Sequence, residues 1–344
     1  MKLKKDHQKT EQEKVDERRE EVLAKGRKFK YPLQWTRYRV VTNTILIAFV
    51  VVGIIFASGY LALYQFNMTD DMLFRITKIL PVPVARVDGE AVRFSDYLMF
   101  YRSSMTSIVR QSAQVHSESS LEALALQYKK EALLEAEKYA YALKLARESE
   151  ITVKPEEVQQ EFERHLKIGG VERSEASFMK IVEENFGLSR DEYERMLYLT
   201  LMKSKVEAEI DTTANGLANR VESLLSENGG DFKAVAEALS GEVQYEETGG
   251  LVSSMNIDGG RASEAIRLSP GEQSGKFVSL NGDGLYFVKL LDKTDTEVNF
   301  ISIKVPFTEF ALRFENLKKD AKIEEYVHFP EAGYGGGNSG VGTN

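Results

Sequence analysis

One apolar run, Ile45–Leu63, constrains this chain more than any other feature of its sequence, and its only polar side chains are Ser58 and Tyr60. About 20 apolar residues in a helix are enough to cross a hydrocarbon core of ~30 Å. A helix pairs its own backbone polar groups, so it needs no further partner in lipid. The run therefore predicts a single membrane-spanning helix over residues 41–66, with Ile45–Leu63 in contact with membrane lipid.

The charges beside this run predict its orientation. Basic residues precede it without any Asp or Glu between Lys25 and Val41, whereas Asp70 and Asp71 follow it. Lys and Arg are enriched on the cytoplasmic side of a span. Residues 1–40 are then a charged cytoplasmic tail, either a solvated helix or disordered, and the bulk of the chain is extracytoplasmic. Cleavage near Ala57 as a signal peptide is the alternative, but the long charged leader favours an uncleaved signal anchor.

Composition excludes several classes of function. The net charge of −8 gives no support for nucleic-acid binding. The absence of cysteine excludes disulfides, thiol catalysis and Cys-ligated zinc. The four histidines have no metal-like partners at helical or hairpin spacing and are expected to be surface residues, and no P-loop, H-E-x-x-H or G-x-S-x-G pattern is present. We therefore expect neither a cofactor nor a metal.

The chain beyond the span divides by its periodicity into a helical section and an α+β section. Residues 84–92 predict two short strands around the Asp88-Gly89 turn, and helical periods then continue to about Ile210. Short helices over 218–225 and 232–239 precede Gly-rich turns and strands at 285–290 and 300–305. The expected fold class is α+β. A C-terminal helix is expected over 306–332, and a disordered Gly-rich tail over 333–344.

Three elements in the helical section resemble the SurA/PrsA/PpiD class of extracytoplasmic foldases. They are Val84–Glu90 with Ser95-Asp96-Tyr97, Glu150–Val158, and Phe186–Ser189 with Glu192-Tyr193. Members of that class join a helical chaperone module to a parvulin-type prolyl isomerase domain. The resemblance implies that residues 82–210 form a SurA-like helical module that binds unfolded or newly secreted polypeptides.

Residues 212–305 resemble a divergent parvulin domain. Asp231-Phe232 with Ala236, Gly249-Gly250-Leu251, and Gly284–Lys289 are similar to parvulin motifs in the same order. The resemblance implies an apolar proline pocket, for which the candidate residues are Tyr286, Leu251, Leu268 and Phe300.

The departures from the parvulin pattern concern its catalytic residues. Tyr286 stands in the place of the last-strand histidine, and Arg261 falls where a pocket Phe is expected. The usual first strand is missing, but residues 298–303 have its character, with Phe300 at the histidine-like position. We therefore hypothesise a permuted sheet, in which 298–305 pairs with 284–291. Whether the chain is an enzyme stays open at this stage.

Three functions follow from the sequence. The favoured one is a membrane-anchored folding factor that binds unfolded polypeptides, with a catalytically weak or inactive parvulin-like domain. The alternatives are an active peptidyl-prolyl cis-trans isomerase and a scaffolding subunit of an envelope complex. Two groups of aromatic and Met residues, one near Tyr97–Met105 and the other near Phe178 and Met196–Met202, could be a cradle for polypeptide or ordinary core.

Overall fold

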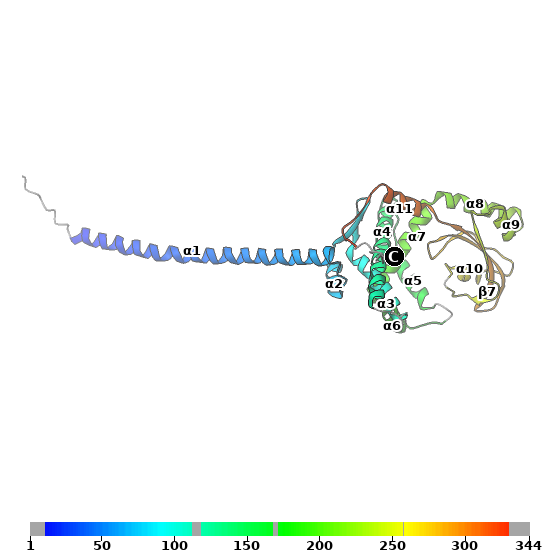
Figure 1. Ribbon diagram of the computed structural model, residues 1–344, viewed down its shortest axis with the longest axis horizontal. Coiled ribbons are helices and arrows are strands. Elements are labelled where there is room, and N and C mark those ends of the chain that lie inside the picture. The colour runs from blue at the N-terminus through cyan, green and yellow to red at the C-terminus, as the bar shows by residue number, and fades with distance from the viewer. Residues whose placement is uncertain (1–10, 112–117, 168–170, 257, 330–344) are drawn as a thin grey trace, which may run out of the picture. The chain divides into compact units, whose positions relative to one another are not determined.

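The structure is a computed structural model that describes residues 11–111, 118–167, 171–256 and 258–329. The chain forms two compact units, Met1–Phe66 and Asn67–Asn344. The expected disordered tail 333–344 lies outside the described residues. The second unit has the α+β architecture predicted from the sequence (Figure 1).

The first unit is dominated by one long helix, α1 (Glu11–Tyr60), which ends in a π-helical turn, η1 (Leu61–Gln65). The segment Tyr38–Gln65 is long and apolar enough to cross a membrane, and its most apolar stretch is wholly exposed. This segment overlaps the predicted span 41–66, whose passage through a membrane stays a prediction. Of the two alternatives expected for the charged N-terminal tail, a helix and a disordered segment, the described part from Glu11 onward is helical.

The second unit begins with a short helix, a hairpin and the helical module. In chain order these are α2 (Asp71–Ile79), β1 (Pro83–Val87), β2 (Glu90–Arg93), α3 (Phe94–Gln111), α4 (Glu118–Glu148), α5 (Pro155–Leu166), α6 (Glu175–Phe186) and α7 (Arg190–Ile210). The hairpin follows from Asp88 and Gly89, which both have positive φ, as a two-residue turn between twisted strands requires.

Helix boundaries in the module follow local capping chemistry. The Ser174 side chain accepts from the Ser177 N–H at 3.3 Å, and Glu192 accepts from the Ser189 N–H at 2.8 Å. Ser174 is the N-cap of α6 and Ser189 is the N-cap of α7. Pro155 occupies the first turn of α5, where its missing N–H costs nothing.

The chain after α7 forms the second sheet and the helices that pack on it. Its elements are α8 (Thr212–Glu227), α9 (Phe232–Ala238), β3 (Gln244–Glu247), β4 (Val252–Ser253), α10 (Arg261–Ala265), β5 (Phe277–Val278), β6 (Gly284–Lys293) and β7 (Glu297–Pro306). The strand order is β3-β7-β6-β5, all neighbours are antiparallel, and β4 pairs with β7. The predicted pairing of 298–305 with 284–291 is confirmed by the β6–β7 register.

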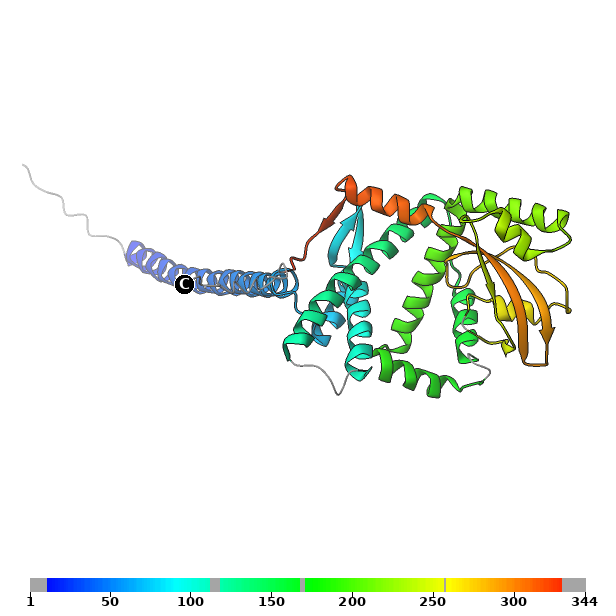
Figure 2. The same ribbon diagram turned by 45° about the vertical axis from the view of Figure 1, so that its right-hand side comes forward.

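Side chains along β6 and β7 point alternately to the two faces of this sheet, so each face has its own hydrophobic core. Leu285, Phe287, Ile303 and Val305 pack with α8 and α9 on one face. Val288, Leu290, Val298 and Phe300 pack with α10 on the other. Figure 2 shows the long β6 and β7 strands between these two layers.

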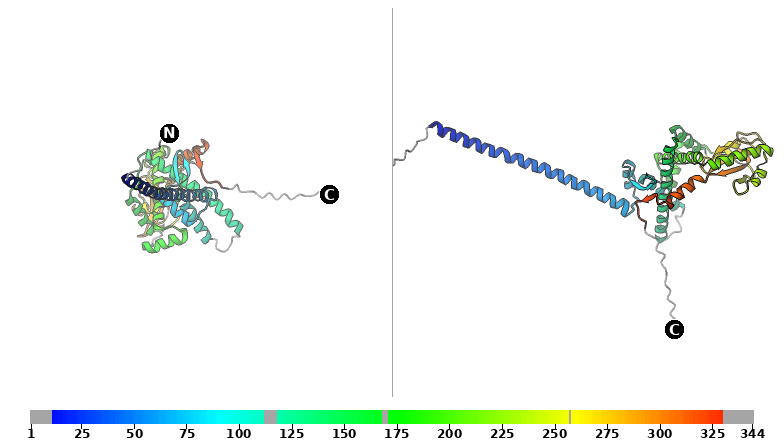
Figure 3. Two further views of the ribbon diagram at one scale, coloured as in Figure 1. Left: turned by 90° about the vertical axis from the view of Figure 1, so that its left-hand side faces the viewer. Right: turned by 90° about the horizontal axis from the view of Figure 1, so that it is seen from above.

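The chain after β7 returns to the helical module. Helix α11 (Glu309–Lys319) packs through Phe310 and Phe314 against Tyr141 of α4, with ring centroids 5.4 and 6.1 Å apart. Strand β8 (Ile323–Glu325) then pairs with β1 and completes the order β2-β1-β8. Figures 2 and 3 show α11 running from the sheet toward β1.

The expected C-terminal helix over 306–332 is thus correct only for 309–319. The helix ends because Ala321 adopts a positive φ of 52°, which turns the chain into β8. Neither Gly nor Pro marks this end in the sequence, so the pattern gave no stop signal.

Gly284 offers a test of the β6–β7 pairing. A Cβ at this position would lie 2.4 Å from the carbonyl oxygen of Val305, a backbone atom that can move only with its strand. We expect Gly284→Ala to lower the free energy of unfolding by about 1–3 kcal/mol, because overpacking must shift the strand. Gly250→Ala is the control, since its Cβ would meet nothing within 4 Å. Equal urea midpoints for the two variants would contradict this expectation.

Candidate functional site

The face of the sheet under α10 brings together the residues expected to form a proline pocket. Antiparallel register places Tyr286 opposite Lys304 and Phe277, and Glu246 opposite Ser302. Paired residues lie on the same face of a sheet. This face therefore has a polar end around Tyr286 and an apolar end around Phe300.

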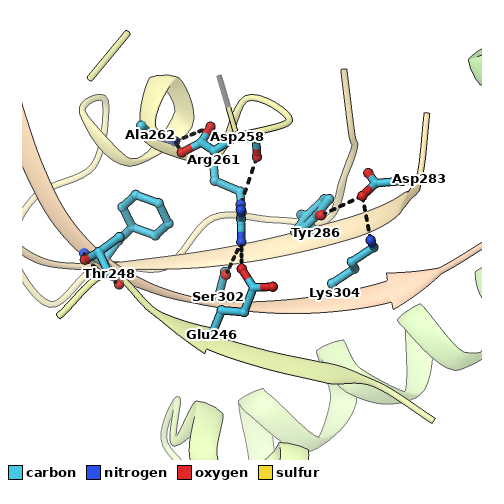
Figure 4. A network of polar contacts seen from close by, with 10 residues as sticks. Glu246, Thr248, Asp258, Arg261, Ala262, Asp283, Tyr286, Ser302 and Lys304 are labelled. Atoms are coloured by element: carbon cyan, nitrogen blue, oxygen red, sulfur yellow. Dashed lines mark hydrogen bonds and ion pairs between the residues drawn. The ribbon is translucent and has the colours of Figure 1, made fainter. Parts of the chain in front are cut away.

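Arg261 of α10 covers the polar end. Its guanidinium forms an ion pair with Glu246, donates through Nη1 to Ser302 Oγ at 3.4 Å, and donates through Nε to the Asp258 carbonyl at 2.8 Å. The same group lies 5.1 Å from the centroid of the Tyr286 ring. Figure 4 shows Arg261 reaching across this face toward Glu246. A cation held by several partners in this way is costly to displace.

Tyr286 is itself part of a second polar group. Its hydroxyl donates to Asp283 Oδ2 at 3.2 Å, and Lys304 Nζ donates to the same oxygen at 2.5 Å. Burial and the nearby Asp283 carboxylate raise the pKa of Tyr286 above its ordinary value. Burial opposes ionisation of Asp283, but hydrogen bonds from Lys304, Ser279 and Tyr286, together with the charge of Lys304, lower the pKa of that carboxyl. Tyr286 is therefore a neutral hydrogen-bond donor at physiological pH.

The four candidate pocket residues are not gathered at one point. Tyr286 lies in the polar end, whereas Leu268 and Phe300 lie in the apolar cluster beneath α10. Phe300 pairs with Leu290 and not with Tyr286, so it does not take the place opposite the tyrosine. Leu251 is 44 % exposed and lies outside this cluster.

Sequence reasoning missed Asp283 and Lys304. Lys304 alternates with the apolar residues Ile303 and Val305 of a predicted strand, and a charge at that register is the only signal that could have found it. Asp283 precedes β6 in a Gly-flanked turn, where an acidic residue is usually solvated. Their pairing is long-range and depends on the β6–β7 register.

The aromatic and Met groups of the helical module are largely core. Tyr97, Met99 and Tyr101 are buried, as is Met202. Phe178 packs edge-on against Phe162 and Tyr193, at 5.7 and 5.5 Å between ring centroids. These members therefore cannot reach a polypeptide at the surface.

An open depression of about 490 Å³ remains between α3 and α6. It is lined by Met105, Thr106, Val109, Arg110 and Glu184. Val109 is 50 % exposed, and Arg110 donates to the Glu184 carbonyl at 2.7 Å, which joins the two helices at its rim. The depression thus offers apolar surface beside the ion pair of Arg110 and Glu184, whose charged atoms are 3.3 Å apart.

His165 differs from the expected surface histidine. Its side chain is 18 % exposed, its Nδ1 lies 2.6 Å from the Tyr193 hydroxyl, and its Nε2 lies 3.2 Å from Glu161. Although burial opposes it, hydrogen bonds from His165 and Arg164 lower the pKa of Glu161 to about 2. This cluster joins α5 to α7.

Among the described residues, no group of three or more His, Asp or Glu is placed to hold a metal ion.

A comparison with family models matches residues 33–207, just over half of the 344-residue chain, to the SurA-like N-terminal domain. The chain belongs to this family, which is one of chaperone-type folding factors that bind unfolded polypeptides in general. No curated protein and no solved structure matches the chain.

Proposed function

We propose that this chain is a membrane-tethered, extracytoplasmic folding factor that binds unfolded or emerging polypeptides and does not catalyse prolyl isomerisation. The observation that carries the proposal is the SurA-like domain joined to an exposed apolar helix, Tyr38–Gln65. The basic residues before the helix and Asp70 and Asp71 after it support a cytoplasmic N-terminus. The tether keeps the module at the surface where secreted chains emerge, which raises its local concentration.

The sheet domain over 212–305 is, in this proposal, a divergent parvulin-like domain with a permuted strand. Strand β7 lies beside β6, as the permutation requires. The boundaries follow from the chain leaving α7 at Asp211 and returning to the helical module with α11.

The polar end of the sheet face, around Tyr286, is occupied by Arg261, and this favours polypeptide binding over catalysis. Prolyl isomerisation needs a dry apolar slot for the ring, in a setting that lowers a barrier of ~20 kcal/mol. Here Arg261 lies over Tyr286, the position of the family's last-strand histidine, and its side chain is 17 % exposed. A proline ring would have to displace a guanidinium that holds Glu246, Ser302 and the Asp258 carbonyl.

The depression between α3 and α6 is the surface proposed to hold polypeptide. Met105 and Val109 supply flexible and branched apolar contacts, which suit unrelated sequences. Its open form suits an extended segment better than a small molecule.

We expect the full-length chain in lipid nanodiscs to suppress aggregation of a chemically unfolded model protein and to leave the isomerisation rate of a proline tetrapeptide at background. Val109→Asp is expected to remove most of the suppression, because it places a charge in the apolar depression. Leu312→Asp on α11 is the matched control, since Leu312 is 58 % exposed on another helix.

The other two functions give different results in these assays. An isomerisation rate clearly above background would overturn the proposal that the parvulin-like domain is inactive, and would support an active isomerase. A lack of suppression, together with stoichiometric co-purification of one folded protein, would replace the folding factor with the envelope scaffold.

A further inference from the structure

Helix α2 has an exposed apolar face. Met72 is 73 %, Ile76 38 %, Ile79 82 % and Leu80 50 % exposed. Met72, Ile76 and Ile79, spaced by four and three residues, lie on one side of α2, and Leu80 follows as its C-cap. Four large apolar side chains in nine or so consecutive positions make a contiguous patch, and such patches mark contact sites.

The opposite face of α2 is already docked on the folded unit. Phe74 and Thr77 are 4 % and 1 % exposed. The Arg102 guanidinium of α3 lies 4.4 Å from the Phe74 ring centroid and also forms an ion pair with Asp71 at 3.2 Å. The helix therefore cannot rotate to bury its apolar face, which the described residues leave uncovered.

The chain places α2 close to the end of the apolar helix. Only residues 66–70 separate η1 from α2. Five residues span at most ~18 Å when fully extended. Asn67 is also fixed to the helical module, because Tyr97 donates to its Oδ1 at 3.2 Å and Lys129 donates to its carbonyl at 2.9 Å. No long flexible linker separates the module from the span.

We propose that α2 lies in the interface of the same bilayer that Tyr38–Gln65 crosses, with Met72, Ile76, Ile79 and Leu80 inserted at the level of the headgroups and upper acyl chains. This inference rests on the proposed membrane anchoring. Arg75 and Lys78 are exposed and lie along one edge of the apolar face, where Arg75 is next to Ile79 and can reach lipid phosphates. An apolar face with one basic edge, within ~18 Å of a membrane exit, fits a lipid surface.

The consequence concerns the orientation of the module. A single span allows rotation about its axis and tilting at its end. A second contact through α2, which is packed on α3, restricts both motions and fixes which surface of the module faces away from the bilayer. The α2 contact is thus a positioning device for the polypeptide-binding surface.

The absence of cysteine makes the test direct, because each single-Cys variant of the full-length chain takes one label. We would attach an environment-sensitive fluorophore to Ile79→Cys, Phe49→Cys and Leu312→Cys in phosphatidylcholine–phosphatidylglycerol vesicles, with and without nitroxide-labelled lipid. All three side chains are highly exposed, so the substitutions leave the core intact. Phe49 reports the span, and Leu312 is an exposed apolar position on α11.

Nitroxide lipid is expected to quench the label at Ile79 by roughly half or more, as for an interfacial helix, and to leave Leu312 nearly unchanged. Quenching at Phe49 but not at Ile79 would overturn the α2 inference and leave the anchor standing. No quenching at Phe49 would instead overturn the anchor. A label at Ile79 that responds only to added unfolded polypeptide, or Ile79→Cys disulfide dimers, would assign the face to a client or to a second copy and likewise overturn the lipid contact.

Discussion

Asp211→Ala is expected to lower the free energy of unfolding by about 3–6 kcal/mol, because it leaves three backbone donors without their acceptor. The Asp211 side chain accepts from Ala214 N–H at 2.8 Å, from Thr308 N–H at 2.7 Å and from Glu309 N–H at 3.0 Å. Asp211 is fully buried, so water cannot replace these bonds. The measurement is the urea midpoint and melting temperature of the full-length chain.

The size of this effect comes from where Asp211 lies in the chain. It ends α7 and begins α8, and its carboxylate also caps the first turn of α11. The positive ends of two helices thus meet one carboxylate, which both satisfies their N–H groups and complements their dipoles. The same residue joins the point where the chain leaves the helical module to the point where it returns.

Asp231→Ala is the matched control. Asp231 caps α9 through one hydrogen bond, to Ala234 N–H at 3.0 Å, and this bond is exposed. Its loss is expected to cost about 1 kcal/mol. Asp211→Asn should lie between the two, because one side-chain oxygen remains. Faster hydrogen exchange at Thr308 and Glu309 in Asp211→Ala alone would locate the damage at the junction, whereas equal losses in both alanine variants would contradict the model of a shared carboxylate.

Local signals in the sequence predicted much of the fold. The Asp88-Gly89 hairpin and the strands β6 and β7 depend on short-range chemistry and were located from the sequence. Even the β6–β7 pairing was predicted, since a family resemblance left one strand position vacant. Each of these elements could be predicted because its signal lies within a few consecutive residues or within the pattern of a known family.

Contacts between distant segments could not be predicted in the same way. Strand β8 has three residues and no clear alternation, yet it pairs with β1 more than 200 positions earlier. Asp211 resembles an ordinary helix cap in sequence, and only the return of α11 gives its second oxygen a role. The Asp283–Lys304 pair at the candidate site likewise exists only once the strand register is fixed.

Stability is expected to fall as pH rises from about 4.5 to about 8, because of Glu137 on α4. Glu137 is 2 % exposed, and its Oε1 has no hydrogen-bond partner among the described residues. Burial, and then the nearby Glu325 of β8, raise the pKa of Glu137 to about 8 against the attraction of Lys318 on α11. The folded state therefore retains a proton that the unfolded state releases near pH 4.5.

The sign follows from proton binding. Between the two pKa values the folded state binds more protons than the unfolded state, so each rise in pH favours unfolding. A shift from 4.5 to about 8 corresponds to about 3–5 kcal/mol, which is present below pH 4.5 and lost once the pH exceeds about 8. Above that pH the carboxylate is charged beside Glu325, which should weaken the packing of β8 and α11 on α4.

Glu137→Gln is expected to remove this dependence, since the amide has the same shape and never ionises. The variant should melt close to the unmodified chain at pH 5 and well above it at pH 9. Glu135→Gln is the control, because Glu135 lies on the same helix but its side chain is 43 % exposed and is paired with Lys138. Melting temperatures measured from pH 5 to 9 decide the matter: parallel curves for the unmodified chain and Glu137→Gln would show that Glu137 ionises in the folded state as freely as in the unfolded one.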